Sequence, residues 1–134
     1  MDSVASVSPA FELIQMRLDR DATASDRLAD GLSHWGIVVG AEHMLDWRNF
    51  DFSELVAILS CNGTQVETRA AAGYIDDHFQ SIAALSKILA KFNRQVLAGN
   101  RVITGSYTRQ CVKERGIWQG NFGEILGDVE IKFI

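Results

Sequence analysis

One carboxylate near the start of the chain has the surroundings of a ligand. Glu12 lies in the apolar stretch 10–18 (AFELIQMRL), where strand alternation would put it on the same face as Ile14 and Met16. A carboxylate among apolar side chains costs free energy unless a cation or a metal ion pairs with it. Glu12 is therefore a candidate metal ligand. The alternatives are a sheet edge that leaves Glu12 solvated, or an ion pair with Arg17.

A histidine stands at the mouth of the next predicted strand. Ser33 and His34 directly precede the apolar run 37–39, which has a glycine on each side. An imidazole there can act as a base or hydrogen-bond a ligand, since it changes protonation near neutral pH. Asp26 and Asp30 are the acids that we expect to pair with it. The alternative is a partly buried histidine bonded to the backbone.

Two polar segments flank the longest predicted helix. Residues 76–78 (DDH) offer three successive ligand groups, although carboxylates at a helix start also cap the helix and suit its dipole. Residues 104–106 (TGS) bring small polar groups and bare backbone N–H to the end of a predicted strand. Such a strand end is a reasonable wall for an anionic ligand.

A helix and a strand in the middle of the chain must position these groups. The segment 77–92 predicts one long amphipathic helix lying on a sheet, because its apolar residues recur at helical spacing. These residues are Ile82, Leu85, Ile88, Leu89 and Phe92. After a turn at 97–100, the β-branched run 101–104 predicts a buried strand that stops at Gly105.

A hairpin and several shorter elements complete the predicted fold. Asn62 and Gly63 form a strong hairpin signal between the predicted strands 52–61 and 65–72. The first of these strands is apolar on both faces, with Leu55, Ala57, Leu59 and Cys61 on one of them. Ser25 and Asp26 can cap a short helical turn. Trp47 and Phe50 are expected to cover part of the core. The fold class is therefore α+β, a β-rich domain with one long helix.

Composition limits the possible partners. The 134 residues, 47% of them hydrophobic, fit one domain spanning 1–134. A net charge of −4 without an evident basic patch argues against nucleic acid or an anionic membrane as partner. No run is long enough to span a bilayer, and the start lacks a basic signal-peptide region, so we expect a cytoplasmic protein. Cys61 and Cys111 lack metal-site spacing and are expected to be free thiols.

The order of these segments resembles a known family. The matching pieces are Pro9 to Ile14 with Arg17, then Asp26 with Ala29 and Asp30, the strand ending at Gly40, the Asn62–Gly63 hairpin, the amphipathic helix, and Leu97 to Gly99 followed by Val102 to Ser106. Together they resemble the C-terminal half of the fumarylacetoacetate hydrolase superfamily. The branch is that of 2-oxopent-4-enoate hydratases and 4-oxalocrotonate decarboxylases.

The resemblance implies a mixed β-roll and a divalent metal, Mg²⁺ or Mn²⁺, held by three carboxylates. In the family the metal acts as a Lewis acid on a 2-oxo acid. Glu12 falls on the third of those carboxylates. Thr104, Gly105 and Ser106 fall on the strand end that lines the substrate pocket, and Arg17 is assigned to the same substrate. Ser33 falls on a small polar loop of the family. The predicted catalytic residues are Ser33, His34 and Asp30.

The resemblance also implies that the site is incomplete on this chain alone. In the family, the other two carboxylates and a catalytic lysine come from an upstream stretch that this sequence does not include. We therefore predict a hydratase-like lyase of 2-oxo or 2-hydroxy-dienoic acids that forms a homo-oligomer or takes the missing ligands from a second chain. The alternatives are a degenerate binding or assembly module of the same fold, and a diverged metal-free enzyme that uses His34 as acid and base.

Overall fold

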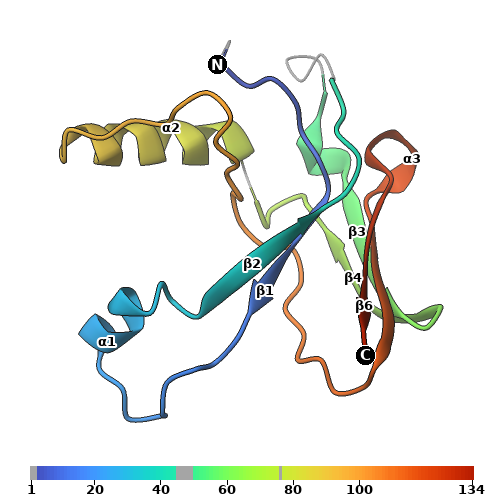
Figure 1. Ribbon diagram of the computed structural model, residues 1–134. Helices are drawn as coiled ribbons and strands as arrows, with labels where there is room; N and C mark the ends of the chain where they lie inside the picture. The colour runs from blue at the N-terminus through green and yellow to red at the C-terminus, as the bar shows by residue number, and fades with distance from the viewer. Residues whose placement is uncertain (1–2, 45–49, 76) are drawn as a thin grey trace.

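The computed structural model describes residues 3–44, 50–75 and 77–134 as an open arrangement of two sheets and two projecting arms (Figure 1). The elements in chain order are β1 (Ala10–Ile14), α1 (Ala24–Ala29), β2 (His34–Val39), the 3-10 helix η1 (Phe52–Glu54), β3 (Val56–Cys61), β4 (Thr64–Ala70), α2 (His78–Ala90), β5 (Gly116–Asn121), α3 (Gly123–Leu126) and β6 (Asp128–Phe133). The described residues therefore confirm the predicted β-rich α+β class. None of these helices has the length and apolarity that crossing a bilayer requires.

The larger sheet has the strand order β4-β3-β5-β6, and every neighbouring pair is antiparallel. Its first hairpin turns at Asn62 and Gly63, which have φ of 49° and 77°. Two successive left-handed residues give the turn whose twist matches a right-twisted hairpin, and Asn-Gly is the pair that tolerates it best. The predicted hairpin is confirmed. The first strand begins at Val56 rather than at residue 52, because residues 52–54 form η1.

Alternation along β3 builds the core. Ala57, Leu59 and Cys61 are buried on one face, while Val56 on the opposite face is 42% exposed. Leu59 and Cys61 pack with Trp118 of β5, and Phe11 of β1 covers this group. Leu55, Ala71 and Leu126 form a second cluster, against which Phe50 packs as predicted. Trp47 lies outside the described residues.

The smaller sheet pairs β1 with β2 and carries α1 at its far end (Figure 1). Thr23 caps α1, and its hydroxyl and backbone exchange hydrogen bonds with Asp26 as in a capping box. The prediction that Ser25 or Asp26 is the N-cap was therefore wrong, because the N-cap is Thr23 and Asp26 is the third helical residue. The predicted strand 10–18 was too long, because pairing ends at Ile14 where the register shifts.

Helix α2 forms where predicted but does not lie on a sheet. Asp77 caps it by accepting hydrogen bonds from the backbone of Phe79 and Gln80, which confirms the capping interpretation. No residue of α2 is buried, and Ile88 is 53% exposed. Figure 1 shows the helix projecting away from both sheets. The expectation of a covered apolar stripe was wrong because β1 and loop residues already cover the sheet.

The predicted strand 101–104 is also absent. Residues 101–106 belong to no strand, and Ile103 is 41% exposed. β-branched residues favour a strand only when another strand accepts and donates their backbone hydrogen bonds. No described segment does so here. The predicted buried strand end at Gly105 is instead an extended, largely exposed segment.

Candidate functional site

One extra residue in β2 brings His34 to the same side of the small sheet as Glu12. Leu13 pairs with Gly36, but the next residue, Ile14, pairs with His34, so Trp35 is left over as a bulge. Side chains alternate between the two faces of a strand, and skipping one residue moves every later side chain to the other face. His34 therefore shares a face with Ile14 and Glu12 instead of pointing the opposite way.

The two side chains are in direct contact. His34 Nδ1 lies 2.9 Å from Glu12 Oε1. The Glu12 side chain is 36% exposed and the His34 side chain 45% exposed, so the pair is open to solvent. Of the two alternatives for Glu12, a solvated edge is close to what is observed, but its partner is His34 and not Arg17. A carboxylate bonded to Nδ1 orients the imidazole and leaves Nε2 available for chemistry.

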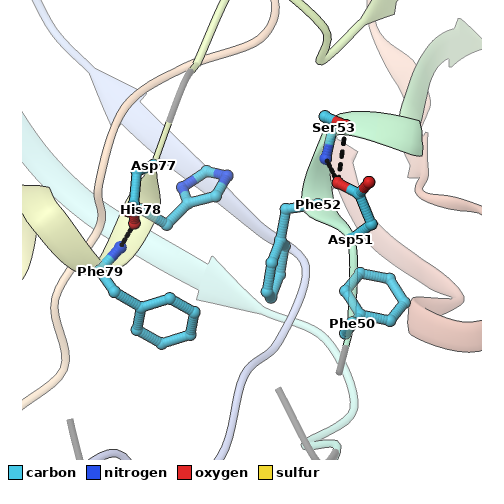
Figure 2. A pocket seen from close by; sticks show the side chains of 7 residues that line it. All are labelled: Phe50, Asp51, Phe52, Ser53, Asp77, His78 and Phe79. Carbon is cyan, nitrogen blue, oxygen red and sulfur yellow. Dashed lines mark hydrogen bonds between the residues drawn. The ribbon is translucent and has the colours of Figure 1, made fainter. Parts of the chain in front are cut away.

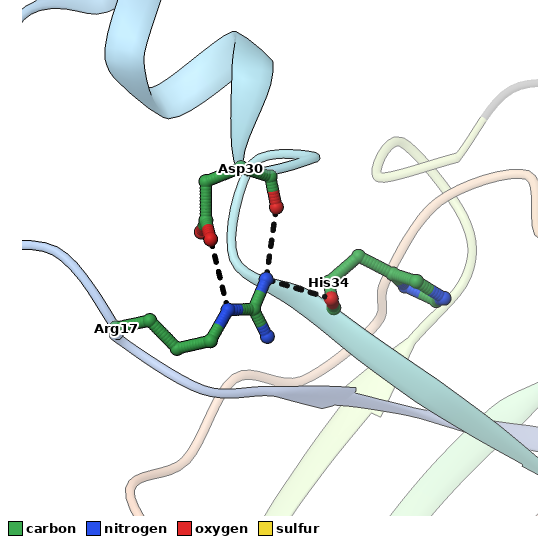
Figure 3. Close-up of polar contacts among 3 residues, drawn as sticks. All are labelled: Arg17, Asp30 and His34. Carbon is green, nitrogen blue, oxygen red and sulfur yellow. Dashed lines mark hydrogen bonds and ion pairs between the residues drawn. The ribbon is translucent and has the colours of Figure 1, made fainter.

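Arg17 clamps the turn that precedes β2 (Figure 3). Its Nε donates to Asp30 Oδ1 at 2.9 Å, and its Nη2 donates to the backbone carbonyls of Asp30 and His34 at 2.8 and 3.1 Å. The predicted pairing of Asp30 or Asp26 with His34 is therefore not what the structure contains. Asp30 is bonded to Arg17, and Asp26 belongs to the α1 cap.

The turn itself is strained. Gly31, Leu32 and Ser33 have φ of 71°, 56° and 65°, which is rare for leucine and serine. The turn is held by the Ser33 carbonyl, which accepts from Gln15 N at 2.9 Å. Ser33 is buried. Strain of this kind persists only where surrounding contacts enforce it, and here it sets the start of β2 beside Glu12.

Asp30 retains one unused acceptor. Its Oδ2 is buried and has no hydrogen-bond partner in the described part of the chain. Glu12, Arg17, Asp30, Ser33 and His34 thus lie at one end of the small sheet. The structure brings these five predicted site residues together.

The remaining predicted residues lie in a different cluster. Thr104 Oγ1 is 2.6 Å from His78 Nδ1, and Tyr107 Oη is 2.7 Å from His78 Nε2. Gly105 has φ of 134°, and a Cβ added there would lie 3.4 Å from Ile75. The Ser106 hydroxyl donates to the Thr108 carbonyl at 2.5 Å. Between described residues, no hydrogen bond or ion pair links 104–106 to Glu12 or His34.

Burial shapes the titration of this second cluster. Desolvation lowers the pKa of His78 below its ordinary value, although nearby Asp77 opposes the shift. Desolvation likewise raises the pKa of the Tyr107 phenol. Burial therefore favours the neutral form of the His78 imidazole, which lies between two hydroxyl groups. Each ring nitrogen has one partner, since a neutral imidazole donates through one nitrogen and accepts through the other.

A small cavity of about 210 Å³ adjoins His78 (Figure 2). It is lined by Phe50, Asp51, Phe52, Ser53, Asp77, His78 and Phe79. Both carboxylates in its lining accept hydrogen bonds from backbone N–H groups. Asp51 accepts from Ser53 N, and Asp77 accepts from Phe79 N. Phe52 packs edge-on against His78 with the ring centres 5.4 Å apart. The cavity therefore lies between the start of α2 and Phe52, which packs against the core.

The described residues do not make a complete metal site. No group of three or more histidine, cysteine, aspartate or glutamate side chains in this part of the chain is arranged to hold an ion. Glu12 offers carboxylate oxygens, but Mg²⁺ requires a near-octahedral set of oxygen ligands. Asp77 and His78, the alternative ligands, are occupied by capping and by Thr104 and Tyr107, and Asp76 lies outside the described residues.

Comparison with known proteins shows which enzymes the chain resembles. No family model matches the chain. It is 29% identical over 116 residues to a 4-oxalocrotonate decarboxylase of Pseudomonas sp, covering 86% of this chain and 44% of the relative. It is 28% identical over 130 residues to a 2-oxo-hept-4-ene-1,7-dioate hydratase of Escherichia coli, covering 89% of this chain and 48% of that relative.

Solved structures of a 4-oxalocrotonate decarboxylase also match the chain. The 4-oxalocrotonate decarboxylase of Pseudomonas putida G7 complexed with magnesium and adipate matches with a TM-score of 0.80 and 26% identity over 96% of this chain and 49% of that one. Its complex with calcium and acetate matches with a TM-score of 0.79, 26% identity and 96% and 48% coverage.

These matches confirm the resemblance predicted from the sequence. The chain has the fold of 4-oxalocrotonate decarboxylase. It spans about half the length of the relatives it matches, as expected for a C-terminal half. The particular proteins that it resembles are 4-oxalocrotonate decarboxylase and 2-oxo-hept-4-ene-1,7-dioate hydratase.

Sequence reasoning missed Tyr107 and the use made of His78. His78 stood out only as one of three successive ligand groups, and Tyr107 did not stand out at all. The available signal was their position: one residue begins a capped helix, and the other directly follows the Thr-Gly-Ser segment. A partner 29 residues away cannot be read from that spacing.

Proposed function

We propose that this chain contributes one wall of the active site of a hydratase-like lyase acting on 2-oxo or 2-hydroxy-dienoic acids. The observation that carries the proposal is the contact of Glu12 with His34 at the mouth of the small sheet, in a chain similar to both a decarboxylase and a hydratase of such acids. The magnesium complex of the similar decarboxylase supports a divalent ion, Mg²⁺ or Mn²⁺, as cofactor.

Glu12 is the metal ligand of this chain. Because no three or more ligand side chains of the described residues are arranged to hold an ion, further ligands come from outside them, either from further polypeptide or from a second copy of the chain. His34, bonded to Glu12 through Nδ1, is the group placed to exchange a proton with a substrate through Nε2. Arg17 and Asp30 hold the His34 backbone in position. Ser33 fixes the turn between them.

The test is a calorimetric titration of Mn²⁺ with and without oxalate. Oxalate mimics the carboxylate and oxo oxygens of a 2-oxo acid and supplies two of the ligands that the chain lacks. We expect weak Mn²⁺ binding that oxalate strengthens by more than about tenfold, since it fills further coordination positions. Glu12→Gln should abolish the oxalate effect, because an amide is neutral and a poorer ligand.

The matched control is Glu130→Gln on β6, an exposed glutamate in the larger sheet rather than in the sheet that carries Glu12. It should bind Mn²⁺ and oxalate as the unmodified chain does. If oxalate leaves Mn²⁺ binding unchanged, or if Glu12→Gln and Glu130→Gln behave alike, Glu12 is not a metal ligand and the metal-dependent proposal fails.

A second function is favoured by the same 2.9 Å contact. A carboxylate bonded to one imidazole nitrogen is a working acid–base pair without any metal. In that case the loss of ultraviolet absorbance by a 2-hydroxy-dienoate would persist in chelator and disappear in His34→Ala. Inactivity in both conditions, with the fold intact, would instead favour a binding or assembly module.

A further inference from the structure

The segment that follows α2 is held in place by side chains rather than by regular structure. Residues 101–113 form no helix or strand. In the part of the chain that the structure describes, they also take part in no backbone–backbone hydrogen bond. Their side chains make three hydrogen bonds to other elements, two to His78 at the start of α2 and one to Glu67 on β4. The position of the segment therefore depends heavily on side-chain contacts.

The contact at the far end of the segment is a hydrogen bond between an amide and a carboxylate. Gln110 Nε2 donates to Glu67 Oε2 at 2.8 Å. The other oxygen of Glu67 accepts from Arg69 Nη2, also at 2.8 Å. Arg69 thus fixes the carboxylate on β4, and the carboxylate holds the segment at residue 110.

The contacts at the near end are made by a single imidazole ring. His78 Nδ1 lies 2.6 Å from Thr104 Oγ1, and Nε2 lies 2.7 Å from Tyr107 Oη. The ring therefore joins two residues that are three positions apart. The two residues between them, Gly105 and Ser106, are exposed. Their backbone N–H groups donate no hydrogen bond within the described chain, so both are available to an anion.

The imidazole is itself fixed to the core. His78 is the first residue of α2, whose cap Asp77 accepts hydrogen bonds from the helix backbone. The ring packs edge-on against Phe52, with the ring centres 5.4 Å apart (Figure 2). Phe52 packs in turn against the buried cluster that contains Leu55. A rigid ring fixed in this way carries its two nitrogens to defined positions.

Of the two hydrogen bonds, the one to Thr104 decides where the exposed loop lies. Tyr107 has a second anchor, because its ring packs against Phe122 and against the same buried cluster. Thr104 makes no other side-chain hydrogen bond among the described residues. Gly105, with φ of 134°, adds no stiffness of its own, since glycine has the widest backbone freedom. Without the imidazole, Tyr107 would keep its ring contacts while Thr104 and the loop would move.

The charge of this part of the chain suits an anion. Residues 78–113 contain six lysines and arginines and no aspartate or glutamate. Asp77, directly before them, uses its carboxylate to cap α2. The loop therefore lies in a stretch of sequence that carries no negative side chain.

We propose that His78 is a positioning residue, whose imidazole spans Thr104 and Tyr107 and so holds the backbone of Gly105 and Ser106 in place as a wall for an anionic ligand. A neutral imidazole suits this role, because one of its nitrogens donates and the other accepts. The ordering of the loop stands on the contacts above alone. The identity of the ligand, a 2-oxo acid bound with a divalent ion, rests on the proposed function.

The ordering is tested by NMR relaxation of the backbone amides, measured without metal or ligand. The order parameters of Gly105 and Ser106 should be about 0.85 in the unmodified chain and fall below about 0.6 in His78→Phe. This substitution removes both hydrogen bonds but keeps an aromatic ring beside Phe52. Thr104→Val/Tyr107→Phe cuts the same two bonds from the other side and should loosen the loop equally. Adding His78→Phe to that pair should change nothing further.

The matched control is Gln110→Leu, which cuts the contact with Glu67 at the far end of the segment. It should leave the order parameters of Gly105 and Ser106 unchanged. Circular dichroism checks that each variant keeps its fold. A loop that stays equally ordered in His78→Phe, or that Gln110→Leu loosens as much, would overturn the proposal whatever happens at Glu12.

The ligand is tested by titrating oxalate in the presence of Mg²⁺ and following the amide resonances of Gly105 and Ser106. Both resonances should shift in the unmodified chain. His78→Phe should weaken oxalate binding about fivefold if the correctly placed loop falls to about one fifth of the population. Gln110→Leu should bind oxalate as the unmodified chain does. Equal binding by His78→Phe would mean that His78 only stabilises the fold, and the positioning role would be refuted.

Failure of this inference and failure of the proposed function give different results. If Glu12→Gln abolishes oxalate binding but Gly105 and Ser106 do not shift, the proposed function stands and the loop is not a wall for the ligand. If the unmodified chain binds no oxalate with Mg²⁺ or Mn²⁺, the proposed function fails and the assignment of the ligand fails with it. The relaxation measurement then decides by itself whether His78 positions the loop.

Discussion

Replacing Tyr107 by phenylalanine tests whether the His78 cluster stabilises the fold. The change deletes only the hydroxyl that lies 2.7 Å from His78 Nε2 and keeps the ring that packs near Phe122. Removing one partner of a buried hydrogen bond costs about 1–3 kcal/mol. Because His78 and Tyr107 are only half-buried and water can reach the vacated nitrogen, we expect about 1 kcal/mol, or about 3 °C in Tm for a chain of this size.

The measurement is urea unfolding followed by circular dichroism, with the free energy taken at constant slope. The matched control is Tyr74→Phe, since Tyr74 is 53% exposed and its side chain contacts Arg69 through the ring, which the change keeps. Combining Tyr107→Phe with Thr104→Val should cost less than the sum of the single changes, because both act through the same imidazole. Equal stability of Tyr107→Phe and Tyr74→Phe would refute the reasoning.

Two further predictions concern pH and the hairpin. Because burial lowers the pKa of His78 below 6.5, the unfolded chain takes up this proton at a higher pH than the folded chain does. The free energy of unfolding should therefore fall as the pH drops below 6.5, and His78→Gln should flatten that dependence in urea titrations at several pH values. Gly116→Ala should cost about 2 kcal/mol or more, since φ is 142° and its Cβ would collide with the Asn62 side chain that binds Ile117 N. Gly36→Ala, in open space, is the control, and equal melting temperatures for the two variants would contradict this account.

Elements whose stability is local were predictable. Asn62 and Gly63 specify a turn by their own backbone preferences, and Asp77 caps whatever helix follows it. Alternation along β3 correctly put Leu59 and Val56 on opposite faces, although the sequence did not show that the Val56 face is exposed. In each case the deciding interaction spans only a few residues, so the sequence contains all of it.

Features that depend on a distant surface were not predictable. The stripe of α2 and the β-branched run 101–104 both indicated burial, yet burial requires a partner that the described chain does not provide. The overall charge of −4 likewise concealed the uneven distribution of charge, since residues 78–113 contain six lysines and arginines and no aspartate or glutamate. At the site, Glu12 and His34 were each singled out, but their contact depends on the bulge at Trp35, for which the sequence gives no signal.

That bulge makes the Glu12–His34 contact depend on the register in which β1 and β2 pair. If Trp35 paired with Ile14 in regular alternation, His34 would move one position along and turn to the face opposite Glu12, with both side chains still in the chain. Deleting Trp35 would instead leave His34 opposite Ile14 and on the side of Glu12, because the bulged residue is the one that the pairing already skips. The residue that decides the contact is thus one that takes no part in it. In this protein the geometry of the site depends on strand register as much as on the identities of the site residues.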